Sequence, residues 1–178
     1  KFTNNKYKNV KLNETAMPVL DRRDYKISPI QISKNHDKNE DLIVFDNEMH
    51  VQSFDFKKYK KVYFVLLENN NRNIKLNSKV LAFKKKIIMS QLNSEQFKSK
   101  LLEEKSFIEF VRNSTSFDAL YPSIGENLSF LKKMIKKHNL KVNFITRKED
   151  EFCWKFSNKG YFNFKTYIPT ILSTFKLN

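Results

Sequence analysis

A chain of 178 residues, 40% hydrophobic and 14% aromatic, is long and apolar enough to bury a core in one large or two small domains. It contains two glycines, too few for a glycine-rich phosphate loop, a dinucleotide fingerprint or a nucleophile elbow, which argues against nucleotide-dependent enzymes. The formal net charge of +15 favours polyanionic partners, with nucleic acid first and an acidic protein or an anionic membrane surface behind it. A charge that only solubilises the protein is the simpler alternative.

Cys153 is the single cysteine and cannot form an internal disulfide, so we expect a reducing intracellular compartment, the nucleus if the cell is eukaryotic. Beside Trp154 in an expected strand, its thiol is more typical of a small packed group than of a nucleophile. No apolar run approaches the ~18 residues of a membrane span, and the start of the sequence lacks a signal-peptide hydrophobic region. We therefore expect no membrane partner.

The first half of the chain is expected to be rich in β-strands. No helical period occurs before residue 90, and prolines and polar stretches separate short β-branched or aromatic runs. These runs are Met17–Leu20, Tyr25–Ile32, Leu42–Asp46, Met49–Phe56, Lys61–Leu67 and Val80–Met89. They predict a small barrel or curled sheet of about five or six strands.

The character of the sequence changes after residue 90. Asn93 and Gln96 predict the cap of a helix that is interrupted near Lys105 and ends near Val111. The fold class expected for the whole chain is therefore α+β, with a β-rich basic domain over residues 1–90 and a second domain over residues 91–178.

A capping box, Ser123 to Glu126, follows Pro122 and predicts the start of another helix. Its apolar stripe leaves Phe130 outside and directs four lysines to the opposite face; the stripe is Ile124, Leu128, Leu131 and Ile135. Asn139 tolerates the left-handed conformation that ends helices, and alternation from Leu140 to Phe144 predicts a strand directly after it.

Two further strands are expected from the alternation of Phe152, Trp154 and Phe156 and from the run Tyr161–Phe164, with a turn at Arg147–Glu151. Helices followed by a β-hairpin resemble a winged helix over roughly residues 91–164, with residues 123–138 as recognition helix and residues 147–151 as the tip of the wing. That resemblance implies contact with nucleic acid.

A β-barrel of the OB-fold type followed by a winged helix is also similar to the middle subunit of replication protein A and its telomere-capping relative. In those proteins the barrel binds single strands or a partner subunit, and the winged helix recruits proteins. Glu149, Asp150 and Glu151 would repel phosphate at the wing tip, and the helix offers lysines rather than groups that read base edges. Single-stranded DNA or RNA is therefore favoured over sequence-specific duplex.

Lysines that neutralise phosphates beside rings that stack on bases are the means of single-strand binding. The alternative is that the rings belong to the core and the lysines are only solvated. The candidate nucleic-acid contacts are Lys57, Lys58, Tyr59, Lys60, Lys61, Lys84, Lys85, Lys86, Lys132, Lys133, Lys136, Lys137, Arg147 and Lys148.

Aromatic residues are so dense near the end of the chain that a small hairpin cannot bury them all. We expect Trp154 and Tyr161 to form a protein interface, although an ordinary aromatic core is the simpler interpretation. A non-catalytic, nucleic-acid-associated subunit of a larger assembly, with other protein subunits as partners, is the predicted function. A scaffold that binds no nucleic acid is the alternative.

A magnesium-dependent nuclease is a distant third interpretation. Asp46, Asp55 and Lys57 would supply the metal ligands and the group that orients water, but such short acid and lysine patterns arise by chance in so lysine-rich a chain. None of the three histidines has a cysteine or acidic residue at the sequence spacing typical of metal ligands; they are His36, His50 and His138. We therefore expect no metal, no other cofactor and no catalytic residue.

Overall fold

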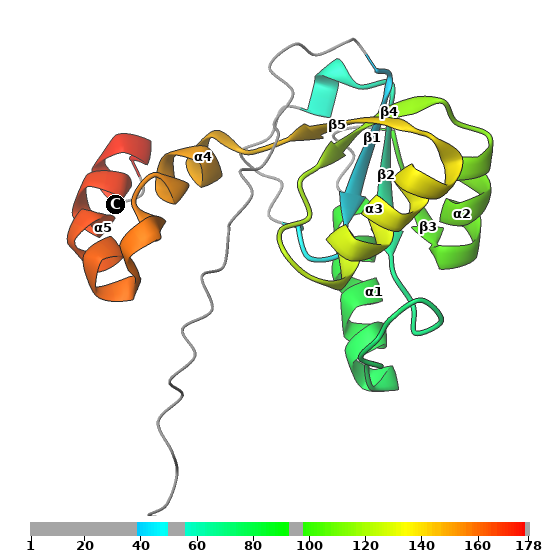
Figure 1. The fold of residues 1–178 in the computed structure, drawn as a ribbon, viewed down its shortest axis with the longest axis horizontal. Coiled ribbons are helices and arrows are strands. Elements are labelled where there is room, and N and C mark those ends of the chain that lie inside the picture. Colours follow the sequence, from blue (N-terminus) through cyan, green and yellow to red (C-terminus); the bar gives the residue numbers. More distant parts are fainter. Residues whose placement is uncertain (1–38, 50–55, 93–97, 177–178) are drawn as a thin grey trace, which may run out of the picture. The chain divides into compact units, whose positions relative to one another are not determined.

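Five parallel strands form one sheet in a computed structural model that describes residues 39–49, 56–92 and 98–176 (Figure 1). The described residues belong to one compact unit within residues 31–178. The strands are β1 (Asp41–Phe45), β2 (Lys61–Leu66), β3 (Ser99–Glu103), β4 (Ser116–Leu120) and β5 (Lys141–Ile145). The helices are α1 (Ser78–Leu92), α2 (Glu104–Arg112), α3 (Glu126–His138), α4 (Lys148–Trp154) and α5 (Tyr161–Phe175), with 3₁₀ turns η2 (Phe56–Lys58) and η3 (Ser157–Lys159). The expected mixture of helices and strands is confirmed.

Strands β1 and β2 are apolar along almost their whole length because helices cover both faces of the sheet. Ile43 and Phe45 of β1 pack with α2 and α3, whereas Leu42 and Val44 pack on the other face, where Ile88 of α1 lies. The side chains from Leu42 to Phe45 are fully buried. The period of two along the strand thus divides its side chains between two cores.

The strand order β3-β2-β1-β4-β5 shows how the chain travels across the sheet. It starts at the centre, moves outward to β3, and then returns past β1 to β4 and β5. Reversing the direction of travel moves right-handed connections to the other face, which accounts for α1 on one side and α2 and α3 on the other. The reversal places a topological switch point between β1 and β4, where sheets of this kind bind ligands beyond the carboxyl ends of their strands.

Helix α3 and strand β5 lie where the sequence predicts them. Asn139 adopts the left-handed conformation (φ 51°, ψ 45°) and its N–H donates to the carbonyl of Ile135, which ends the helix as expected. The start of the helix was predicted wrongly. Ser123 has a φ of 55°, its hydroxyl donates to Glu48, and Gly125 is the residue at the cap position.

The predicted stripe of α3 also needs correction at two positions. Ile124 precedes the helix and is 90% exposed, whereas Phe130 is 3% exposed and packs against Phe107 of α2. The buried side of α3 is therefore wider than the stripe, because α2 and the sheet both cover it.

The barrel expected in the first half is not found in its described residues. The pairing of β1 with β2 is parallel, and the expected strand Val80–Met89 lies within helix α1. Lys84 to Lys86 explain this difference, because a buried strand would direct at least one of three consecutive lysines into a core. The expected strands Met17–Leu20 and Tyr25–Ile32 lie outside the described residues, as does most of Met49–Phe56.

The division expected at residue 90 does not separate two domains in the described structure. Residue 90 lies inside α1, and β2 from before it pairs with β3 from after it. The helix expected to be interrupted near Lys105 is strand β3 followed by α2, which begins at Glu104.

The hairpin on which the winged-helix resemblance depended is not formed. Its expected first strand is β5, which pairs in parallel with β4, whereas the residues expected as the two further strands lie in α4 and the turn after it and in α5. A spacing of four also joins neighbours on one helix face, and Phe152 meets Phe156 edge to face at 5.3 Å between ring centroids. Phe156 in turn stacks on Tyr167 of α5 at 4.4 Å. Phe152 and Phe156 therefore pack the α4 segment against α5, where they meet Phe175 and Tyr167.

Candidate functional site at the carboxyl ends of the strands

Polar side chains follow the carboxyl ends of the strands or lie in the connections that leave them. Because all five strands are parallel, these ends share one edge of the sheet. We call these residues the carboxyl-edge cluster: Asp46, Asn47 and Glu48 after β1, Asn71 and Arg72 after β2, Lys84 of α1, Glu104 after β3, Ser123 and Asn127 after β4, and Arg147 after β5.

Asp46 is the centre of the cluster. Its side chain is fully buried, its Oδ2 contacts the ammonium of Lys84, and its Oδ1 accepts a 2.9 Å hydrogen bond from Asn127. The guanidinium of Arg72 lies 4.0 Å from the same Oδ1. A buried carboxylate requires such compensation, since removing a charge from water costs several kcal/mol, about as much as its partners recover. Asp46 therefore joins α1, α3 and the β2–α1 connection to the end of β1.

Arg72 is held in place by the end of β2. Its Nε and one terminal nitrogen donate to the carbonyl of Leu67 at 3.0 and 2.9 Å, and its side chain is 7% exposed. Asn69 closes the connection by donating to the carbonyl of Leu76 and accepting from its N–H, both at 2.8 Å. The charge of Arg72 is therefore directed toward Asp46 rather than toward solvent.

Arg147 forms a second buried pair at the same edge. It donates to the carboxylate of Glu48 at 2.7 Å, to the Glu48 carbonyl at 3.0 Å, and to Asp150 of α4 at 3.0 Å. Arg147 is 8% exposed, which corrects its prediction as a nucleic-acid contact at the tip of a wing. It connects the end of β5 and the start of α4 to the end of β1.

Two acceptors of the cluster receive no hydrogen bond from the described residues. Asn127 uses its Nδ2 to donate to Asp46 and to Asn47, and its buried Oδ1 is unpartnered. Glu104 accepts from Asn71 at 2.7 Å through Oε1, and its buried Oε2 is unpartnered. A buried acceptor without a donor costs about 1–3 kcal/mol, so both oxygens are suited to accept hydrogen bonds from a bound molecule.

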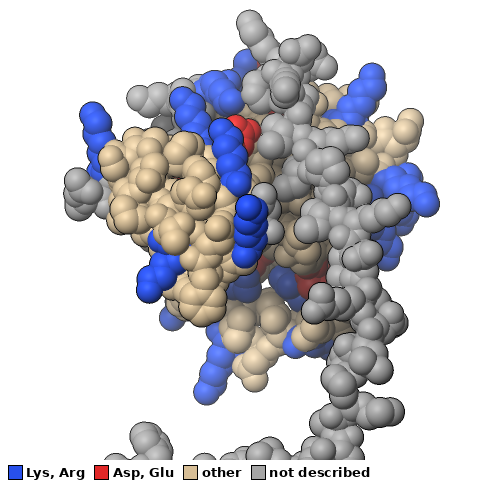
Figure 2. All heavy atoms as spheres, turned by 60° about the vertical axis from the view of Figure 1, so that its left-hand side comes forward, with Lys and Arg blue, Asp and Glu red and all other residues tan. Residues whose placement is uncertain are grey.

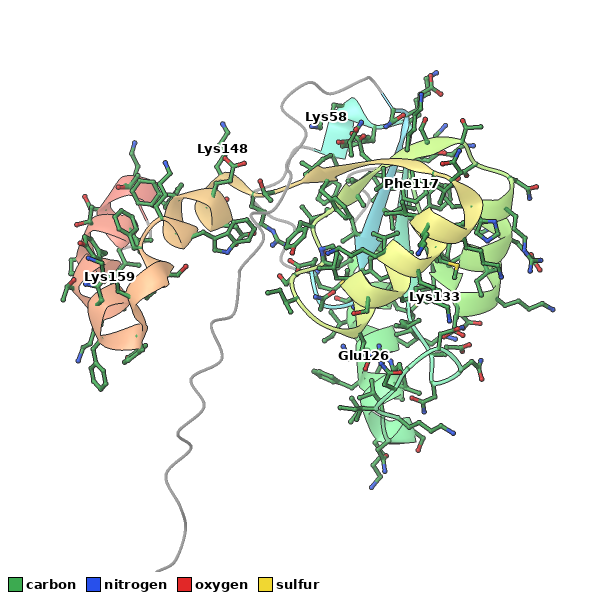
Figure 3. All side chains as sticks on the ribbon, in the orientation of Figure 1. Lys58, Phe117, Glu126, Lys133, Lys148 and Lys159 are labelled. Carbon is green, nitrogen blue, oxygen red and sulfur yellow. The ribbon has the colours of Figure 1, made fainter. Side chains whose placement is uncertain are left out.

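The four lysines predicted for the outer face of α3 are exposed, and Figure 3 shows Lys133 among them. Lys148 is exposed on α4 and Lys58 on η2, so the exposed candidates are spread over separate elements (Figure 3). In Figure 2 the visible Lys and Arg side chains are likewise scattered among uncharged surface. The cationic surface seen there is diffuse.

Several other candidate lysines contact acids of the chain. Lys84 is part of the carboxyl-edge cluster, Lys60 contacts Glu40, and Lys85 contacts Glu103. Lys61 and Lys86 are exposed, while the side chain of Lys57 lies outside the described part of the structure. For these lysines other than Lys84, a role in binding nucleic acid stays a prediction. Lys84 differs because its ammonium pairs with the buried carboxylate of Asp46.

Tyr59 does not offer a ring for base stacking. It is 8% exposed, and its hydroxyl donates to Asp118 at 2.8 Å. Burial, the hydrogen bond and the charge of Asp118 raise the pKa of Tyr59 well above its ordinary value. Asp118 also accepts from Asn39 at 2.8 Å and from Asn143 at 3.1 Å. This network joins β4, β5 and the segment before β1, which accounts for the presence of a tyrosine there.

The two aromatic residues predicted for a protein interface differ in exposure. Trp154 is half-buried and meets Tyr121 edge to face at 5.9 Å between ring centroids, whereas Tyr161 is 67% exposed beside the more exposed Phe162.

Burial, with the charges of Asp150 and Glu149, raises the pKa of the Cys153 thiol, which makes it a weaker nucleophile.

No group of three or more His, Cys, Asp or Glu side chains within residues 39–49, 56–92 and 98–176 is placed to hold a metal ion. Of the predicted nuclease residues, Asp46 is paired with Lys84, and Asp55 lies outside the described residues. Among the helices of the described part, none is long and apolar enough to cross a membrane.

Comparison of the chain with protein-family models, with curated proteins and with solved structures gave no significant match.

Proposed function

We propose that this chain binds a small polar molecule of the nucleoside type at the carboxyl edge of its sheet, between β1 and β4. The observation that carries the proposal is Asn127, a 6% exposed residue beside the topological switch point whose buried Oδ1 has no donor among the described residues. The link from strand order to ligand position is an analogy at the level of the fold, since open α/β sheets bind ligands at such points.

The chemistry of the edge favours a ligand that donates hydrogen bonds over one that presents phosphate. Helix N-termini bind phosphate in many α/β proteins, but Glu126 places a carboxylate in the first turn of α3. The cations of the cluster, Arg72 and Arg147 among them, are directed to buried carboxylates. Ribose hydroxyls and base amino groups, which are donors, suit the acceptor oxygen of Asn127, which has no donor among the described residues.

Calorimetric titration of the whole chain with adenosine, guanosine, cytidine and uridine tests this proposal, with Asn127→Ala as the variant. Asn143→Ala is the matched control, because it also removes an amide that donates to a buried aspartate, Asp118, from the middle of β5. Both variants should lose stability, and only Asn127→Ala should weaken nucleoside binding, by tenfold or more. Equal affinities of the two variants, or no binding of any nucleoside, would overturn the proposal.

A second candidate function is the association with nucleic acid expected from the sequence. The observation in its favour is the outer face of α3, where all four lysines are exposed while the opposite face is buried. Lysine contacts with phosphates would supply most of the binding energy, so the chain would act without catalysis as a subunit of a nucleoprotein assembly. Single-stranded DNA or RNA is the expected ligand, and other protein subunits are the expected partners.

Salt dependence separates this candidate from a diffuse charge effect. Replacing all four α3 lysines by glutamine, at Lys132, Lys133, Lys136 and Lys137, should flatten the plot of log affinity against log salt. The expected change in slope is about 0.7 for each single-strand phosphate that the variant no longer neutralises. Four exposed lysines on other elements make the control, replaced together: Lys79, Lys86, Lys105 and Lys155. Equal flattening in both variants would mean that α3 has no special part in binding.

A further inference from the structure

A cavity of about 360 Å³ lies at the amino ends of β4 and β5, the edge of the sheet opposite the carboxyl-edge cluster. The walls are the connection from α2 into β4, the end of α3 and the start of β5. We call it the amino-edge cavity. Its lining residues are Ser114, Thr115, Ser116, His138, Asn139 and Lys141.

Every lining residue is polar, and none is acidic. The group offers the hydroxyl of Thr115, an imidazole and the ammonium of Lys141 as hydrogen-bond donors, while the hydroxyls of Ser114 and Ser116 already donate to Phe110 and Asn39. The Nε2 of His138 is buried and neither gives nor receives a hydrogen bond among the described residues. A polar cavity with donors, a fixed positive charge and no carboxylate is suited to an anion.

Backbone contacts fix the walls before any ligand binds. The N–H of Lys141 donates to the carbonyl of Thr115 at 3.0 Å, and the hydroxyl of Ser114 donates to the carbonyl of Phe110 at 2.8 Å. The N–H groups of Asn139 and Leu140 both donate to the carbonyl of Ile135. Preformed walls of this kind reduce the ordering that binding requires.

The end of α3 opposes an anion through its carbonyl dipoles, since a helix C-terminus carries partial negative charge. Against this effect, the last turn contains Lys136, Lys137 and His138, and Lys141 lines the cavity itself. Each lysine carries a full positive charge against the partial charge of the helix end, while the buried Asp118, joined to the lining residue Ser116 through Asn39, carries a negative one.

We propose that the amino-edge cavity binds a phosphomonoester group, with His138 and Lys141 as its main ligands. The cavity is at the lower end of the size range of small-molecule sites, so it has room for more than the phosphate alone. Two carriers share this chemistry, a small phosphorylated metabolite and the 5′-phosphorylated end of a nucleic-acid strand. The site is separate from the nucleoside site of the carboxyl edge and does not depend on it.

Nuclear magnetic resonance of the His138 imidazole in the whole chain tests the inference. The probes are inorganic phosphate, adenosine 5′-monophosphate, adenosine, and a short oligonucleotide with and without a 5′-phosphate. The phosphorylated probes should shift the His138 signal, and their unphosphorylated counterparts should not. A shift with the monophosphate alone would identify a metabolite, and a stronger shift with the phosphorylated oligonucleotide would identify a strand end.

Lys141→Gln, at an exposed position, should weaken binding of the phosphorylated probe at least fivefold, while Lys132→Gln, at an exposed position of α3, should change it less than twofold. The two lysine variants test the site independently of the His138 signal. An unmoved His138 signal with every phosphorylated probe, an equal shift with adenosine, or equal losses in the two lysine variants would each overturn the inference.

Discussion

The two edges of the sheet handle charge in opposite ways. At the carboxyl edge, charges of both signs are buried and paired, with Asp46 fully enclosed by Lys84 and Asn127. At the amino edge the cavity is lined by six polar residues, of which one is a lysine and none is acidic. Single replacements at the carboxyl edge should therefore cost more folding free energy than single replacements at the amino edge, because they leave a buried charge without its partner.

The largest effect is expected from Asp46→Ala. It leaves Arg72 and Lys84 without their buried counterion, and breaking a buried pair from one side costs about 3–5 kcal/mol. Urea unfolding measures the loss. The control is Glu40→Gln, which removes an exposed pair with Lys60 and should change the free energy of unfolding by about 1 kcal/mol or less. Similar losses in the two variants would show that the carboxyl edge is not the more demanding one.

The next effect concerns the pair of Arg147 and Glu48. A double-mutant cycle with Arg147→Gln and Glu48→Gln should give a coupling energy of about 1–3 kcal/mol, because the two side chains are in contact and each is only 9% exposed. Chemical denaturation of the four proteins supplies the cycle. A coupling energy near zero would mean that the chain does not keep the end of β5 attached to β1 in this way.

The sequence allowed the parts near Asn139 to be predicted, because a helix, its left-handed end and the following strand are encoded within a few neighbouring residues. The carboxyl-edge cluster is encoded differently. Lys84 and Asn127 lie 38 and 81 positions after Asp46, and no local period joins them. Strand β4 was missed for a similar reason, because it is five residues long and carries Asp118 in its centre.

One signal in the sequence pointed to the correct sheet. The runs 42–45 and 62–67 are apolar without alternation, which is typical of strands buried on both faces of a parallel sheet and not of a barrel with a solvated side. Asp46 follows the first of these runs directly, at the position where such sheets place functional groups. The wide stripe of α3, including Phe130, could not be seen on its own, because it depends on contacts with α2.

A smaller effect is expected from Tyr59→Phe, which removes one of three hydrogen bonds to Asp118 and should cost about 1–2 kcal/mol. The raised pKa of Tyr59 means that the folded state favours the protonated phenol. Its stabilisation is complete below the ordinary tyrosine pKa of about 10 and is lost as the pH rises above that value. The free energy of unfolding measured from pH 8 to 11 should therefore fall more steeply for the wild type than for Tyr59→Phe, and parallel curves would contradict the prediction.

The smallest effects should come from the amino edge. Asn139→Gly suits the left-handed backbone and should change the free energy of unfolding by no more than about 1 kcal/mol, whereas Asn139→Ala should cost about 1–2 kcal/mol. Thermal unfolding of the pair measures the difference. If both substitutions cost as much as Asp46→Ala, the two edges would be equally demanding and the comparison would fail.

The central claim is that the carboxyl edge of the sheet binds a nucleoside-type molecule, and amide chemical-shift mapping tests it most directly. Titration with the best-binding nucleoside should shift the side-chain amide of Asn127 and the backbone amides that follow β1 and β4. The amides around the amino-edge cavity should stay in place. Shifts centred elsewhere, or none with any of the four nucleosides, would contradict the account.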